Sequence, residues 1–222
     1  MKKTIVTIDG PAGAGKSTVA KTLAANLGYV YVDTGALYRG VAYEIQNHSV
    51  DRADRQALSE FLNQLAFDCH MENQNFRLFS FGRDISEKIR TPDISMLASS
   101  VSAIPEVRSA LLGIQKQVAQ THDSVFEGRD MGTVVFPSAD FKFFLTADLS
   151  VRAKRRYLQD GGTSQSLEDV EKQMEKRDAD DSQRSFAPLK VPDDAMVVDS
   201  TRLTAEEAAK KMYNFIENSS CL

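Results

Sequence analysis

The residues best suited to chemistry begin at Gly10, where the chain follows the pattern Gly-x-x-x-x-Gly-Lys-Ser up to Ser17. This spacing is typical of a phosphate-binding loop. Its glycines let backbone N–H groups approach a phosphate, because no Cβ stands in the way. Lys16 can reach the β- and γ-phosphates of a nucleoside triphosphate, and the Ser17 hydroxyl suits Mg²⁺. We expect the phosphates to be held by Gly10, Pro11, Ala12, Gly13, Ala14, Gly15, Lys16, Ser17 and Thr18.

The segments on either side of this loop have the structure that the pattern requires. The apolar residues Ile5, Val6 and Ile8 predict a short buried strand before it. A helix over 16–27 follows, ends at Gly28, and presents its positive N-terminal end to the anion. A chance run of glycines is the alternative interpretation, and the flanking strand and helix argue against it. We therefore predict nucleoside triphosphate binding.

Two further groups of polar residues follow predicted strands. From Asp33 to Arg39, a carboxylate, a hydroxyl, a phenol and a guanidinium lie within two turns, with Thr34 as the expected N-cap of a helix. Glu127 ends another strand and could hold a water of the Mg²⁺ shell, while Arg129 would point to a bound phosphate. The alternatives are a core tyrosine with a solvated arginine in the first group, and a local ion pair in the second.

Two predicted helices carry charged residues on one face. In the later helix they stand at i, i+4 and i+7: Arg177, Asp181 and Arg184. In the earlier helix three arginines precede a Gly-Gly break: Arg152, Arg155 and Arg156. A flexible, arginine-bearing segment suits a lid that closes over a triphosphate and excludes water. The alternatives are a surface ion-pair stripe and a solvated basic helix.

The framework that positions these residues alternates strands and helices. The alternation predicts an α/β, P-loop NTPase three-layer fold, with about five parallel strands and helices on both faces. Right-handed crossovers bring the loops that follow such strands to one edge, so Asp33, Glu127 and Arg129 should line the same crevice. After the first strand, we expect strands at 29–32, 124–127, 142–145 and 195–199, and helices at 34–46, 149–159, 166–181 and 204–218. Within 34–46, Leu37, Val41 and Ile45 form an apolar stripe that we assign to the core.

The alternation is interrupted from about residue 51. The patterns there predict a helix at 54–65, a hairpin of 67–70 and 76–81 around a turn at 72–75, a third strand near 83–85, and helices at 92–103 and from Pro105. We expect one domain over 1–222 with a small inserted antiparallel sheet. Its core would be about 1–52 and 104–222, its insertion about 53–103, and its lid about 152–166.

Composition and charge limit the kinds of partner. The formal net charge of the 222 residues is −4, which gives no sign of a general nucleic-acid-binding surface. The two cysteines, Cys69 and Cys221, have no metal-ligand spacing, and we expect free thiols of a reducing compartment. No signal-peptide pattern or membrane-spanning apolar stretch is found. We expect a cytoplasmic protein.

Four stretches together resemble the bacterial cytidylate kinases, a branch of the nucleoside monophosphate kinases. They are Ile8 to Ser17, Asp33 to Arg39, Gly128 to Pro137, and Lys176 through Arg184 to Leu189. The resemblance runs from Ile5 to the last predicted helix. It implies a monomer that transfers the γ-phosphoryl group of MgATP to CMP or dCMP, in pyrimidine nucleotide metabolism. It also implies an enlarged monophosphate-binding insertion, which matches the hairpin at 66–85.

The resemblance implies roles for individual residues. Positions that read the cytosine edge are matched by Ser99, Arg108 and Asp130, and those that hold the ribose by Arg177 and Asp181. The acceptor phosphate would be held by Arg39, Arg129 and Arg184, near Thr34 and Tyr38, and ATP would be faced by Arg155 and neighbouring lid arginines. Ser17 would bind the metal directly, and Glu127 and Asp33 through water. Glu127 is a departure, because related kinases commonly have Asp there.

The reaction so implied needs no general base. A phosphate monoester is already substantially ionised at neutral pH, because its second pKa is about 6. The difficulty is repulsion between an anionic acceptor and an anionic γ-phosphate, so we expect catalysis by positioning and charge neutralisation. Guanidinium groups suit this task because they bind phosphate oxygens bidentately. The residues expected to act on the transferred group are Lys16, Arg39, Arg129, Arg155 and Arg184.

Base selection and two rival functions complete the expectations. A carboxylate such as Asp130 can accept from the exocyclic N4 amine of cytosine, which uracil replaces with a carbonyl, so we expect CMP to be preferred over UMP. One rival is another small-molecule P-loop kinase, acting on UMP, AMP or shikimate. The other is a nucleotide-binding switch protein, against which the lack of a guanine-reading Asn-Lys-x-Asp stretch argues.

Overall fold

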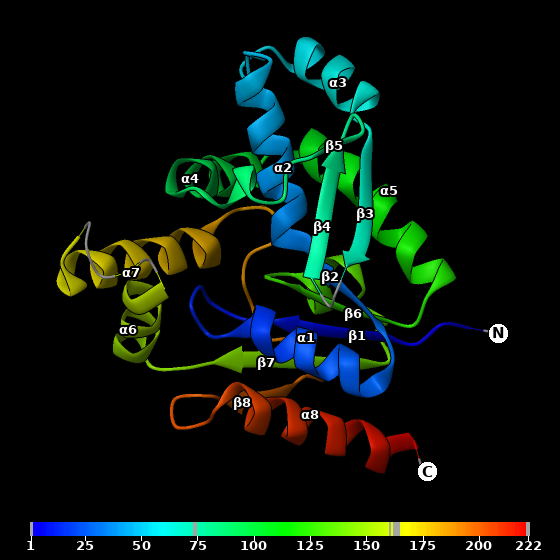
Figure 1. Cartoon of the computed structure of the whole chain (residues 1–222), viewed down its shortest axis with the longest axis vertical. Helices are drawn as coiled ribbons and strands as arrows, with labels where there is room; N and C mark the ends of the chain where they lie inside the picture. Colours follow the sequence, from blue (N-terminus) through cyan, green and yellow to red (C-terminus); the bar gives the residue numbers. More distant parts are fainter. Residues whose placement is uncertain (1, 73–74, 160, 162–164, 221–222) are drawn as a thin grey trace. The chain divides into compact units, whose positions relative to one another are not determined.

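The computed structural model describes residues 2–72, 75–159, 161 and 165–220, and Figure 1 labels its elements. The chain forms two compact units. The first, here called the P-loop unit, consists of Thr4–Val30 and Asp123–Leu222. The second, here called the 31–122 unit, is built mainly from Tyr31–His122 and contains the predicted insertion at about 53–103.

The strands of the P-loop unit are parallel. They are β1 (Ile5–Asp9), β6 (Ser124–Gly128), β7 (Phe141–Thr146) and β8 (Met196–Asp199). With β2 (Val30–Asp33) they form a five-stranded sheet in the order β2-β6-β1-β7-β8. β1 pairs with β6 and β7, and its register sets Asp9 beside Gly128. The predicted parallel sheet of about five strands is confirmed.

The helices of the P-loop unit follow the predicted pattern closely. α1 (Lys16–Leu27) ends at Gly28, which adopts the left-handed conformation with a φ of 70°. α1 lies beside α8 (Ala205–Ser220), as Figure 1 shows, and Phe215 of α8 meets Phe143 of β7 edge to face. α6 (Leu149–Gln159) packs against α7 (Leu167–Gln183). A short π-helix, η2 (Met131–Val135), follows β6 and has no counterpart among the sequence predictions.

The 31–122 unit combines helices with a small antiparallel sheet. The sheet has the order β3 (Phe67–Glu72), β4 (Asn75–Ser80) and β5 (Arg83–Asp84), which confirms the predicted hairpin and third strand. The helices are α2 (Thr34–Asn47), α3 (Arg55–Gln64), α4 (Pro92–Val101) and α5 (Pro105–Thr121), with a 3-10 turn, η1 (Lys88–Arg90). Leu37, Val41 and Ile45 of α2 are buried, as their spacing predicts.

The start of α2 differs from the prediction. Thr34 is not the N-cap: Asp33 takes that place, and its Oδ1 accepts the N–H of Ala36 at 2.8 Å. The reason is that the carboxylate ends a strand, where the backbone is still extended as an N-cap requires, whereas Thr34 is already helical.

Some predictions fall on residues outside the described part of the chain. These are the turn residues Asn73 and Gln74, the break at 160–164 except Gly161, and Cys221. Among the helices that the structure describes, none is long and apolar enough to cross a membrane.

Cys69 in β3 is a free, half-buried thiol. Burial, with a smaller contribution from Asp68, raises the pKa of Cys69 to about 12. We expect a thiolate-selective reagent at pH 8 to modify it about 1,000-fold more slowly than the same thiol in the urea-unfolded chain, since only the thiolate reacts. The Cys221→Ser variant makes Cys69 the single thiol for this measurement. Equal rates in the folded and unfolded chains would contradict the burial.

Candidate active site

The phosphate loop lies between β1 and α1, and its conformation requires glycine. Gly10 has a φ of 150°, and a Cβ there would lie 2.0 Å from the carbonyl oxygen of Leu145. Gly13 has a φ of 71°, and its Cβ would lie 2.6 Å from Cε of Met174. A side chain at Gly10 would collide with the backbone of β7, and the positive φ at both positions favours glycine.

Lys16, the first residue of α1, is buried and directed back over the loop. Its Nζ donates a hydrogen bond to the Pro11 carbonyl at 2.8 Å. The pKa of Lys16 is lowered to about 7, chiefly by burial and in part by the guanidinium groups of Arg129 and Arg177, while Glu127 and Asp9 oppose the shift. Three cationic side chains therefore converge beside the phosphate loop, and an anion bound among them would favour the charged form of Lys16.

Arg152 and Asp178 hold the backbone of the loop. Arg152 of α6 donates through Nη1 to the Ala12 carbonyl at 3.0 Å and to Asp178 Oδ2, and Asp178 Oδ1 accepts the N–H of Ala12 at 3.3 Å. Ala12 also packs in an apolar cluster with Ala153, Val170 and Met174. The sequence analysis places Arg152 among the arginines of the predicted lid. In the structure, the contacts of Arg152 and Asp178 join α6 and α7 to the loop.

Replacing Arg152 by leucine is expected to lower the free energy of unfolding by about 3 kcal/mol, because it leaves the Asp178 carboxylate without its buried cation. Urea denaturation measures the loss. Lys154→Leu is the matched control, because Lys154 is exposed on the same helix and its replacement should change stability by less than about 0.5 kcal/mol. Equal losses in the two variants would contradict a stabilising role of the Arg152–Asp178 pair.

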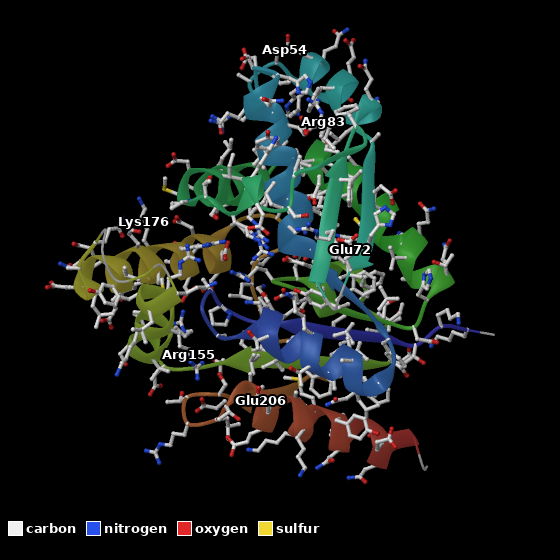
Figure 2. The ribbon with its side chains drawn as sticks, viewed as in Figure 1. Asp54, Glu72, Arg83, Arg155, Lys176 and Glu206 are labelled. Atoms are coloured by element: carbon white, nitrogen blue, oxygen red, sulfur yellow. The ribbon has the colours of Figure 1, made fainter. Side chains whose placement is uncertain are left out.

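Arg155, which the resemblance assigns to ATP, contacts the segment after β8. It is labelled on α6 in Figure 2, and its Nη2 donates to the Ser200 carbonyl at 2.7 Å. The Ser200 hydroxyl lies 3.1 Å from the Ala14 carbonyl of the phosphate loop and 3.0 Å from the Thr146 carbonyl. Ser200 was not identified by any sequence pattern, since a lone serine after a strand carries no signal.

Four of the predicted acceptor residues lie together in the P-loop unit. Arg129 donates through Nε to Asp181 Oδ2 at 2.9 Å. Arg184 lies 3.7 Å from an oxygen of Asp130 and 3.9 Å from one of Asp181. Asp130 and Asp181 are buried, so this is an interior ion-pair cluster rather than a solvated stripe. The cluster lies where β6 and α7 end, in the same unit as the phosphate loop.

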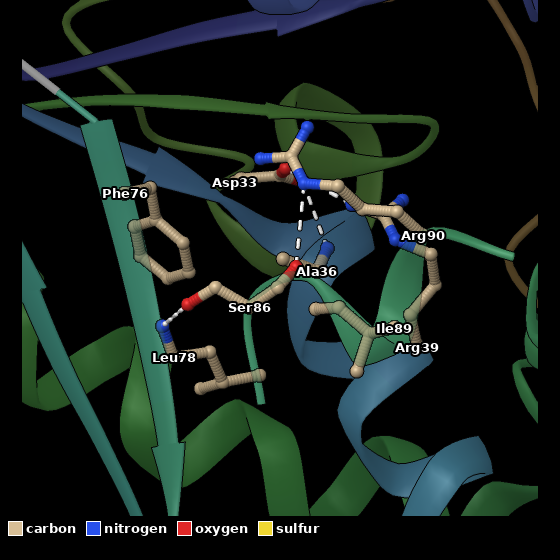
Figure 3. Close-up of a pocket in the computed structure, with 8 residues that line it drawn as sticks. All are labelled: Asp33, Ala36, Arg39, Phe76, Leu78, Ser86, Ile89 and Arg90. Atoms are coloured by element: carbon tan, nitrogen blue, oxygen red, sulfur yellow. Dashed lines mark hydrogen bonds and ion pairs between the residues drawn. The ribbon is translucent and has the colours of Figure 1, made fainter. Parts of the chain in front are cut away.

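The 31–122 unit holds a second group of predicted residues. Asp33 Oδ2 accepts from Nη2 of Arg39 at 3.1 Å, so both oxygens of this carboxylate are engaged. Figure 3 shows the pocket beside this pair, which also contains Arg90, a residue that no motif singled out. The full lining is Asp33, Ala36, Arg39, Phe76, Leu78, Ser86, Ile89 and Arg90. Two guanidinium groups at one pocket suit an anionic ligand.

The predicted base-reading residues of the 31–122 unit are on or near α4 and α5. Arg108 is buried, donates to the Ser102 carbonyl at 3.1 Å, and lies over the ring of Tyr38 at 5.7 Å. Thr34 is buried at the start of α2, and Ser99 is half-buried in α4. Their assignments to substrate stay predictions.

The residues present fit a magnesium ion that is bound largely by phosphate and water. Within the described ranges, no group of three or more His, Cys, Asp or Glu side chains could hold a metal. Ser17 is exposed in the first turn of α1, and Glu127 is buried at the end of β6. Mg²⁺ commonly takes one or two protein ligands and completes its shell with substrate oxygens and water, so this small donor set suffices.

The chain is similar to known proteins over nearly its whole length. The cytidylate kinase family model matches residues 6–218. The cytidylate kinase of Lactobacillus johnsonii is 43% identical over 214 residues, which cover 96% of this chain and 93% of that protein. The cytidylate kinase of Caldanaerobacter subterraneus subsp. tengcongensis is 45% identical over 213 residues, covering 95% and 93%.

A solved structure shows the same fold in a more distant protein. Shikimate kinase from Bacteroides thetaiotaomicron is 12% identical and has a TM-score of 0.50, covering 96% of this chain and 98% of that one. This likeness shows a common fold alone, while the family model and the relatives at 43% and 45% identity show the family. The chain belongs to the cytidylate kinase family.

Proposed function

We propose that this protein transfers the γ-phosphoryl group of MgATP to CMP or dCMP, forming ADP and CDP or dCDP. The observation that carries the proposal is a phosphate loop with Lys16 folded back over it, 2.8 Å from the Pro11 carbonyl. The same unit holds the ion-pair cluster of Arg129 and Arg184. Such a cluster neutralises several phosphates at once, which a reaction between two nucleotides requires. Membership of the cytidylate kinase family indicates that the acceptor is a cytidine monophosphate.

In this mechanism the protein positions the two nucleotides and neutralises the charge of their phosphates, and no side chain removes a proton. The loop amides and Lys16 hold the β- and γ-phosphates, while Arg129, Arg184 and Arg39 hold the acceptor phosphate. Arg177 and Asp181 hold the ribose. The partly buried Arg129–Asp181 pair keeps one guanidinium edge oriented before the acceptor binds.

A magnesium ion would be held by Ser17 and, through water, by Glu127, and it would supply positive charge that neutralises the triphosphate. Asp33 is the less suitable partner for a metal-bound water, because Ala36 and Arg39 already occupy its two oxygens. Arg155 contributes by holding Ser200 against the Ala14 carbonyl, in addition to any contact with ATP.

Cytosine is distinguished from uracil by Asp130, with Ser99 and Arg108 as further base-reading residues. The Asp130 side chain is buried, so it accepts from the N4 amine of cytosine but meets the O4 carbonyl of uracil with no proton between them. A buried polar group left unpaired in this way costs about 1–3 kcal/mol.

The proposal is tested by ADP production from MgATP with CMP, dCMP, UMP, AMP, GMP and shikimate in parallel. We expect rapid turnover with CMP and dCMP and little with the others. Turnover with a different acceptor would support phosphoryl transfer by this protein but reject the residues assigned to cytosine recognition. Slow hydrolysis that no acceptor accelerates would favour a nucleotide-binding switch protein instead.

A further inference from the structure

Asp9 is a buried carboxylate that the mechanism above does not use. It is the last residue of β1, directly before Gly10, and its side chain is fully buried. Oδ1 accepts the N–H of Met131 at 2.9 Å, and Oδ2 accepts the N–H of Gly132 at 2.7 Å. These two residues follow Asp130 and begin η2. Asp9 therefore joins the strand that leads into the phosphate loop to the turn that carries Arg129 and Asp130.

A carboxylate fits this position better than any neutral side chain. It offers one acceptor oxygen to each of two consecutive N–H groups, whereas asparagine would turn an NH₂ donor toward one of them. Burial raises the pKa of Asp9 to about 6, and the two amide hydrogen bonds oppose that rise. A buried carboxylate costs desolvation free energy that an apolar residue would avoid. The two hydrogen bonds that it accepts therefore indicate that Asp9 serves to position the backbone of Met131 and Gly132.

The segment that these hydrogen bonds fix is the backbone of Asp130. The Asp130 carbonyl accepts the N–H of Val134 at 2.9 Å, and the two following residues donate to Asp9. On the other side, the β1–β6 register sets Gly128 beside Asp9. Because the backbone is held before and after Asp130, its Cα–Cβ bond has a fixed direction. The carboxylate it carries is only 2% exposed.

The close approach also depends on Gly132. A Cβ at this position would lie 3.0 Å from Thr7 Oγ1 and from Pro192 Cγ, and 3.3 Å from Asp9 Oδ2. All three distances are shorter than ordinary van der Waals contacts. Gly132→Ala would therefore disturb the contact between the amides and Asp9 while leaving the Asp9 carboxylate intact.

We propose that Asp9 is a positioning residue that, through the amides of Met131 and Gly132, directs the Asp130 carboxylate at the acceptor base and so sets the preference for cytosine over uracil. The inference rests on the proposed function, because it takes Asp130 to be the group that meets the N4 amine. Its consequence is that a residue of the strand leading into the phosphate loop controls selectivity for the acceptor.

The test compares kcat/KM for CMP with kcat/KM for UMP at saturating MgATP. Asp9→Asn is expected to lower the CMP:UMP ratio about tenfold, the effect of losing one buried hydrogen bond. Asp123→Asn is the matched control, because Asp123 Oδ1 accepts the N–H of Thr4 at 2.7 Å just before β1, and this variant should keep the wild-type ratio. Gly132→Ala should lower the ratio in the same direction as Asp9→Asn.

A double-variant cycle shows whether Asp9 acts through Asp130. In the Asp130→Asn background, Asp9→Asn should change the ratio by less than about twofold, since residues that act as a unit are not additive. A wild-type ratio in Asp9→Asn, or additive effects in the cycle, would overturn the proposal. If Asp9→Asn does not fold, an unchanged ratio in Gly132→Ala overturns it equally.

The controls also separate this inference from the proposed function. A wild-type ratio in Asp130→Asn alone would reject both base reading by Asp130 and the role of Asp9, while leaving phosphoryl transfer to CMP intact. Lack of CMP-dependent turnover in the unmodified protein would reject the proposed function itself.

Discussion

Lys16→Met is expected to lower kcat about 1,000-fold. The ammonium group lies beside the phosphate loop, where Arg129 and Arg177 add to the positive charge, so its removal takes away neutralisation of the transferred phosphoryl group. Steady-state kinetics with MgATP and CMP measure the loss. A loss of less than about tenfold would contradict the assigned role.

The same variant should not be less stable than the wild type. Burial lowers the pKa of Lys16 to about 7, so at neutral pH the unfolded chain holds this proton more readily and the buried lysine opposes folding. Lys142→Met is a matched control, because Lys142 is also buried but bonds to Asp194 and the Pro137 carbonyl outside the candidate site. It should show the opposite pattern, with retained activity and a lower unfolding temperature.

Asp130→Asn is expected to reduce the CMP:UMP ratio of kcat/KM about 100-fold, the equivalent of roughly 3 kcal/mol. The neutral amide can turn its NH₂ toward the O4 carbonyl of uracil, so it relieves the unpaired contact and weakens the bond to cytosine. Asp181→Asn is the matched control, because Asp181 is also buried and also lies near Arg184. It should lower kcat/KM for both acceptors and leave their ratio unchanged, and an unchanged ratio in Asp130→Asn would reject base reading by this carboxylate.

The elements that follow local patterns could be predicted from the sequence. The helix at Leu149–Gln159 has the predicted bounds, and α1 begins at Lys16 and ends before Gly28 as expected. The hairpin of β3 and β4 was recognisable because alternating residues flank a run of turn formers. In each case the signal lies within a few residues of the element itself.

The parts of the site that depend on distant contacts could not be predicted in this way. Asp9 meets amides 122 and 123 residues further along the chain, and nothing near Asp9 indicates them. In the sequence, Arg152 is one of three arginines on a predicted helix, and nothing near it indicates its pairing with Asp178 of α7. Helical spacing identifies a shared face, but packing decides which arginine of that face is buried.

The most direct test of the central claim is the fate of the γ-phosphoryl group. The protein is incubated with [γ-³²P]ATP, Mg²⁺ and CMP, and the products are separated by thin-layer chromatography. We predict that the label appears in CDP, that its appearance requires CMP, and that Lys16→Met abolishes it. Label released as inorganic phosphate at a rate independent of CMP would contradict the assignment of this chain as a kinase that acts on CMP.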